Sequence, residues 1–159
     1  MADRDPITCH VLNTVNGTPA PGLSCTLTLH SLLLPPGAAQ PANLPVTLHA
    51  ATDPDGRVKK WTPSSSYSSA ANNAPSSPPA GIREILEAIH EQYSGQQRSI
   101  WSLKIKKVGE WYAEQGVESF WPEVEVRFLV KGSEKWEGWR HYHVPVLLGP
   151  WNYSTYRGS

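Results

Sequence analysis

The sequence is poor in cysteine, has no long apolar run and has no excess of charge of either sign. Two cysteines in 159 residues, Cys9 and Cys25, are too few for a disulfide-built domain and fit a reducing compartment. The formal net charge of +0 gives no reason to expect nucleic acid or an anionic membrane as a partner. No apolar stretch approaches the roughly 18 residues of a membrane span, and the first residues lack the basic and apolar regions of a signal peptide. We therefore expect a cytoplasmic protein.

The length of the chain favours one domain that covers residues 1–159. Eight of its fifteen prolines lie in two stretches, residues 35–45 and 63–80, which indicates inserted loops. Apart from Tyr67, residues 63–80 are only Pro, Ser, Ala and Asn. Such a stretch buries too little apolar surface to offset the entropy of ordering it, so it is interpreted as a low-complexity insert.

Alternation of apolar and polar side chains predicts about eight β-strands. They cover residues 7–12, 23–30, 46–52, 57–61, 99–107, 122–130 and 141–148, and the last follows the Gly149-Pro150 break. No strand–helix–strand rhythm is present, so the pattern favours an antiparallel β-sandwich.

Three local signals qualify this pattern. Apolar residues recur at helical spacing from Ile82 to Tyr93, which predicts an extra amphipathic helix that packs on the sheet. Residues 108–115 predict a short helix that ends at Gly116, after the fifth strand. Asp55-Gly56 is typical of a two-residue type I′ hairpin, which would put Arg57 first in the returning strand.

The C-terminal part carries the most specific pattern. His141 and His143 fall two apart in a predicted strand, so they face the same side, roughly 6–7 Å apart. A β-type pattern then continues to the last residue, which suggests a terminus held in the structure. The His-Tyr-His-Val-Pro run at 141–145 and the Tyr-Arg-Gly-Ser at 156–159 resemble the C-terminal signature of the 5-hydroxyisourate hydrolases, transthyretin-like enzymes of urate breakdown.

Three further blocks carry the same resemblance, at residues 7–20, 52–58 and 108–113. The regions 32–47 and 63–98 are longer and more irregular than the family pattern. The resemblance implies a transthyretin-like sandwich of two four-stranded sheets with one short helix. It also implies a homotetramer, a dimer of dimers with substrate clefts at the dimer–dimer interface, and an enzyme that needs no cofactor.

The resemblance further implies hydrolytic opening of the six-membered ring of 5-hydroxyisourate at its N1–C6 amide. A histidine would activate water, because an imidazole that titrates near pH 6.5 accepts a proton at neutral pH, and an arginine would stabilise the oxyanion. Which histidine acts as the base stays open. The implied catalytic residues are His10, Arg57, His143 and Ser159, and the implied substrate-binding residues are Tyr156, Arg157, Gly158 and, as a supporting residue, His141.

Several alternatives compete with this interpretation. The same fold serves small-ligand carriers, which lack this set of residues, and a sandwich alone would also suit an adhesion module. Cys9 beside His10 resembles a nucleophilic dyad, but adjacent strand residues face opposite sides. His10, His141 and His143 could hold zinc, although no acidic or cysteine ligand completes the set, so we expect no metal. His30, His49 and His90 are interpreted as ordinary histidines. Because urate-degrading enzymes are often peroxisomal, that compartment is the alternative to the cytoplasm.

Overall fold

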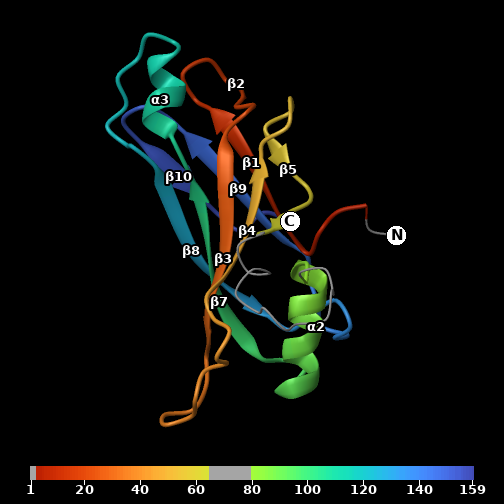
Figure 1. Ribbon diagram of the computed structural model, residues 1–159. Helices are drawn as coiled ribbons and strands as arrows, with labels where there is room; N and C mark the ends of the chain where they lie inside the picture. Colours follow the sequence, from red (N-terminus) through yellow and green to blue (C-terminus); the bar gives the residue numbers. More distant parts are fainter. Residues whose placement is uncertain (1–2, 65–79) are drawn as a thin grey trace.

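The computed structural model describes residues 3–64 and 80–159, and within them the chain forms two packed β-sheets (Figure 1). Sheet A contains, in order, β10 (Tyr153–Thr155), β9 (Tyr142–Leu148), β1 (Ile7–Asn13) and β2 (Thr18–Pro19), with β5 (Arg57–Val58) also paired to β1. Sheet B contains, in order, β6 (Thr62–Pro63), β4 (Val46–Ala51), β3 (Ser24–Leu32), β7 (Arg98–Ile105) and β8 (Val124–Lys131).

The predicted β-sandwich is confirmed, but each sheet has five strands where four were expected. The two additional strands, β2 and β6, are two-residue pairings, too short to show an alternating pattern. The expected strand at 57–61 is shorter than predicted: only Arg57–Val58 form a strand, β5 in sheet A, and the chain then crosses to β6 in sheet B. The sandwich is also not wholly antiparallel, because β1 and β9 run parallel over seven residue pairs.

The core lies between the sheets and is made by the alternating apolar residues. Cys9 and Val11 of sheet A face inward, as do Leu27 and Leu103 of sheet B, and all four are at most 1% exposed. Buried Trp101 satisfies its indole N–H by donating to Ser99 Oγ at 2.8 Å. Burial of this apolar surface is the main force that holds sheet A, and with it the outward-facing residues, in one register.

Two helices occupy opposite ends of the sandwich (Figure 1). The predicted extra helix is α2 (Ile82–Gln92), which buries Ile82, Leu86 and Ile89. The predicted short helix is α3 (Val108–Ala113). Its Tyr112 is fully buried, and its hydroxyl lies 2.8 Å from Asn13 Oδ1 at the end of β1. Neither helix is long and apolar enough to cross a membrane, and the structure describes no other helix that is.

The turn before Arg57 differs from the predicted type I′ hairpin. The N–H of Gly56 donates to the carbonyl of Asp53 at 2.8 Å, so Pro54 and Asp55 are the central residues. A type I′ turn needs positive φ at both central residues, and proline is restricted to φ near −65°. Only Gly56 adopts positive φ here, at 74°. Arg57 still begins the next strand, β5, as expected, although β5 pairs with β1 and not with β4.

The low-complexity insert predicted at 63–80 falls, apart from its ends, on residues 65–79, which lie outside the described residues.

Candidate active site

The outer face of sheet A brings together side chains from four separate parts of the chain. The parallel register of β1 and β9 sets Thr8 beside His143, and the antiparallel register of β1 and β5 sets His10 beside Arg57. Thr8 and His10 are two residues apart on β1, so they share one face. Cys9, between them, faces the core with 1% exposure. The Cys9–His10 dyad therefore does not form.

Thr8 links two histidines: His143 in β9 and His141 directly before β9. Its Oγ1 lies 2.9 Å from His141 Nε2 and 2.8 Å from His143 Nδ1. The expectation that both imidazoles share a face is confirmed. Thr8 itself was not predicted as a site residue, although its alternation placed it on the face of His10. A single hydroxyl hydrogen serves one imidazole only, so Thr8 accepts a hydrogen bond from one ring and donates to the other.

Burial keeps both of these imidazoles uncharged at neutral pH. Burial is the largest cause that lowers the pKa of His141 to about 4, and the positive charge of Arg4 lowers it further. The pKa of His143 is lowered by burial and then by the electrostatic effects of Arg57, His10 and Arg4. Removing an imidazole from water disfavours its charged form, and nearby cations disfavour it further. The pair is therefore available to accept protons.

His10 is held by the turn that precedes Arg57. Its Nε2 lies 2.9 Å from the carbonyl oxygen of Asp55. A carbonyl only accepts, so His10 Nε2 carries the hydrogen and its Nδ1 is left as the acceptor. The turn is closed by Asp53, whose Oδ1 accepts from the N–H groups of Asp55 and Arg57, both at 2.9 Å.

Gly56 packs this turn directly on β1. Its carbonyl accepts from the N–H of Val11 at 2.8 Å. A Cβ at position 56 would overlap the carbonyl oxygen of Val11 and lie 3.0 Å from the nitrogen of Ala20. Close backbone approach therefore positions Arg57. Among the described residues none pairs with the Arg57 guanidinium, so its donors face solvent or a ligand.

The C-terminal tail returns to His143. After β10, the N–H of Gly158 donates to the carbonyl of His143 at 2.8 Å, and the two residues form an antiparallel bridge. A Cβ at Gly158 would lie 2.7 Å from His143 Cδ2 and 3.0 Å from Pro145 Cγ. The absent side chain lets the tail rest against the imidazole. The prediction that the terminus is held in the structure is thus confirmed, and a backbone hydrogen bond holds it.

Arg157 and the remaining tail side chains lie at the rim of this arrangement. The Arg157 guanidinium stacks 4.0 Å over the ring of Tyr142, and its Nη2 donates to the carbonyl of Arg140 at 3.3 Å. Tyr156 is 61% exposed, and Ser159 is also exposed. Tyr156, Arg157 and His143 line a pocket of about 310 Å³ that β8 closes on its other side with Val126 to Leu129.

All eight predicted site residues therefore border one region of sheet A and the adjoining tail. The roles assigned to them stay predictions. Within residues 3–64 and 80–159, no group of three His, Cys, Asp or Glu side chains is arranged to hold a metal ion.

Comparisons with known proteins identify the family of the chain. A model of the HIUase/Transthyretin family matches residues 7–158. A 5-hydroxyisourate hydrolase of Mus musculus is 32% identical over 159 residues, which cover 99% of this chain and 98% of the mouse protein. A protein of Caenorhabditis elegans named probable 5-hydroxyisourate hydrolase is 51% identical over 49 residues, 31% of this chain.

The chain matches only 32% of the length of that nematode relative. The solved structure of Klebsiella pneumoniae 5-hydroxyisourate hydrolase has a TM-score of 0.53 and 21% identity, and the match covers 96% of this chain and 92% of that one. This last likeness supports the fold. The family model and the full-length mouse relative together show that the chain belongs to the HIUase/transthyretin family.

Proposed function

We propose that the protein is a 5-hydroxyisourate hydrolase, which opens the six-membered ring of its substrate to 2-oxo-4-hydroxy-4-carboxy-5-ureidoimidazoline. The observation that carries the proposal is the convergence of His10, Arg57 and the Thr8-linked pair of His141 and His143 on one face of sheet A. The mouse relative, 32% identical over 98% of its length, is itself named 5-hydroxyisourate hydrolase, which supports the proposal.

His143 is the better placed of the two predicted bases. In the arrangement that we favour, His143 Nδ1–H donates to Thr8 Oγ1 and Thr8 donates to His141 Nε2. His143 Nε2 then keeps a free lone pair to accept a proton from water. The low pKa of His141 fits its part in this arrangement, since an uncharged ring can accept from Thr8.

The reaction follows from this arrangement. Water attacks the C6 carbonyl as His143 takes its proton, and the Arg57 guanidinium stabilises the negative charge that develops on the carbonyl oxygen. The C6–N1 bond then breaks, the proton passes to N1, and C6 becomes a carboxylate. His10 orients the water, Ser159 completes the proton relay, and Tyr156, Arg157 and Gly158 bind the substrate.

We also propose that the active assembly is a homotetramer, a dimer of dimers. The edge strands β8 and β10 lie on the same side of the sandwich, where their residues line one pocket, and every β10 side chain is exposed. An unpaired strand edge is a template for pairing with a second chain. The open face of sheet A would gain its missing wall from another subunit. Light scattering coupled to gel filtration tests this: a mass of four chains is expected, and a monomer contradicts it.

A small-ligand carrier is the alternative function. The face described above is polar and holds uncharged imidazoles beside an unpaired guanidinium, which suits catalysis better than an apolar binding channel. As part of the proposal the protein acts in the cytoplasm, with the peroxisome as the alternative compartment.

The activity can be tested by ultraviolet spectroscopy. Freshly generated 5-hydroxyisourate should disappear faster with the protein than in buffer, in proportion to protein concentration. His143→Ala should remove most of this acceleration, whereas His49→Ala, at an exposed position in sheet B, should leave it intact. Loss of substrate at the buffer rate would reject the enzyme and favour the carrier.

A further inference from the structure

Arg4 precedes β1 and belongs to none of the segments that predicted the site, yet its backbone is firmly held. The next residue, Asp5, donates its N–H to the carbonyl of Lys59 at 2.7 Å. The Asp5 carboxylate accepts from the N–H of Trp61, also at 2.7 Å. The N–H of Tyr142 donates to the carbonyl of Pro6 at 3.2 Å, which extends the β1–β9 pairing toward the chain start. The backbone directly after Arg4 is therefore fixed both to the start of β9 and to the segment that follows β5.

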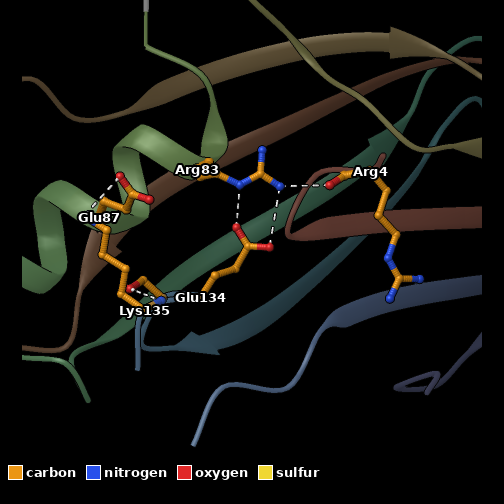
Figure 2. A network of polar contacts seen from close by, with 6 residues as sticks. Arg4, Arg83, Glu87, Glu134 and Lys135 are labelled. Atoms are coloured by element: carbon orange, nitrogen blue, oxygen red, sulfur yellow. Dashed lines mark hydrogen bonds and ion pairs between the residues drawn. The ribbon is translucent and has the colours of Figure 1, made fainter. Parts of the chain in front are cut away.

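Helix α2 adds a second restraint on Arg4. Arg83, in the first turn of α2, donates through Nη2 to the carbonyl of Arg4 at 2.9 Å. Its Nε lies 2.5 Å from Glu134 Oε1, in the segment between β8 and β9. Lys135 also approaches Glu87 of α2 at 3.6 Å. Figure 2 shows this network, in which one guanidinium joins the helix, the start of the chain and the segment that leads into β9.

The Arg4 side chain is not used in this network. In Figure 2 its guanidinium extends away from Arg83 and Glu134, toward the C-terminal part of the chain. Its positive charge acts on both His141 and His143. Among the described residues none forms an ion pair or hydrogen bond with the Arg4 guanidinium. A fixed backbone thus carries a cation that has no partner among the described residues and whose charge acts on both imidazoles.

We propose that Arg4 is a further substrate-binding residue and that Arg83 is the positioning residue that holds it. This inference rests on the proposed function. The guanidinium would donate to the carbonyl oxygens of the planar substrate and to the carboxylate that ring opening creates, a geometry for which its forked donors are suited. Arg57 would approach the same substrate from the β5 side of His10. The helix in the irregular region between β6 and β7 would then serve the active site.

Steady-state kinetics of Arg4→Gln test the inference. We expect kcat/KM for 5-hydroxyisourate to fall about 10- to 100-fold, mainly through KM, since the variant loses charge-assisted hydrogen bonds to the substrate. Arg4→Lys should recover part of the loss. Arg98→Gln, which removes an exposed arginine at the start of β7, should match the wild type. Arg83→Gln should reproduce part of the Arg4→Gln defect in KM.

The pH profile separates binding from a structural role. Burial and the electrostatic effects of Arg57, His10 and Arg4 lower the pKa of His143, and Thr8 joins its ring to that of His141. Removal of the Arg4 charge should raise the pKa of His143, so the acid limb of kcat/KM should move to higher pH in Arg4→Gln and stay in place in Arg98→Gln. If the kcat/KM and the acid limb of Arg4→Gln match those of Arg98→Gln, the inference is wrong.

Binding of urate, an unreactive oxopurine, separates this inference from the proposed function. Quenching of tryptophan fluorescence by urate should give an affinity about tenfold weaker for Arg4→Gln than for the wild type. If the wild type fails to hydrolyse 5-hydroxyisourate but this difference is found, the function is wrong and the role of Arg4 stands. Equal affinities, or no binding by either protein, would reject the role of Arg4.

Discussion

The N–H of Gly158 donates to the carbonyl oxygen of His143 at 2.8 Å, so the penultimate residue of the chain is bonded to the backbone of the proposed base. This contact turns an exposed tail into part of the site. It requires a glycine, because a Cβ at position 158 would lie 2.7 Å from the imidazole. Strand pairing in β10 brings the tail to this point.

We expect the tail to be needed for activity but not for stability. Deletion of Gly158-Ser159 should reduce kcat by about 10²-fold or more, since it removes the relay group and the contact with His143. Gly158→Ala should have a similar effect, because the added carbon displaces the tail. Both variants should melt within a few degrees of the wild type, because few buried contacts are lost. Full activity of the deletion would show that the tail plays no catalytic part.

Thr8→Val removes the hydroxyl between the imidazoles while keeping the shape of the side chain. We expect kcat to fall about tenfold or more, because His143 loses the bond that orients its ring. The variant should also lose about 1–3 kcal/mol of stability, since two ring nitrogens are left without their partner. Stopped-flow kinetics and urea unfolding measure the two effects.

Thr28→Val is the matched control for Thr8→Val. Thr28 is a half-buried strand threonine in sheet B whose Oγ1 lies 3.4 Å from Thr47 Oγ1, a weak contact. The kcat of Thr28→Val should equal that of the wild type. If Thr8→Val also keeps its kcat, the hydroxyl has no role in the reaction.

The pH dependence of kcat/KM should reflect the lowered pKa of His143. A base must be uncharged, so activity is complete above its pKa and falls as the pH drops through it. Because burial and the electrostatic effects of Arg57, His10 and Arg4 lower this pKa, the acid limb should lie below pH 6.5. Arg57→Gln should shift the limb to higher pH in the activity that remains. A wild-type limb above pH 6.5 would contradict His143 as the base.

Gly56→Ala tests whether the turn positions Arg57. Gly56 has φ of 74°, and its added Cβ would overlap the carbonyl oxygen of Val11. Strain and overlap should lower the unfolding free energy by about 1–3 kcal/mol or more and reduce activity as Arg57 moves. Gly37, with φ of 85° and nothing within 4 Å of its Cβ position, shares the strain without the overlap. Gly37→Ala should therefore lose less stability than Gly56→Ala and no activity. If the two variants lose equal stability and equal activity, the turn does not position Arg57.

The strands of the core and the type of fold could be predicted from residue order alone, because burial of one face leaves an alternating pattern such as that of Leu27 and Leu29. The same alternation placed His141 and His143 on one face, and the family resemblance supplied His10, Arg57 and the tail as candidates.

Which residues from distant segments contact one another became clear only from the three-dimensional structure. The partnership of Thr8 with His143 depends on a parallel register between strands separated by 135 residues, and no local pattern specifies which distant strand is the neighbour. The division of residues 57–63 between the two sheets and the restraint of Arg4 by Arg83 arise in the same way. Local alternation records which side of a strand is buried, whereas contacts between distant segments form only when the sheets pack, and the geometry of the candidate site is built from such contacts.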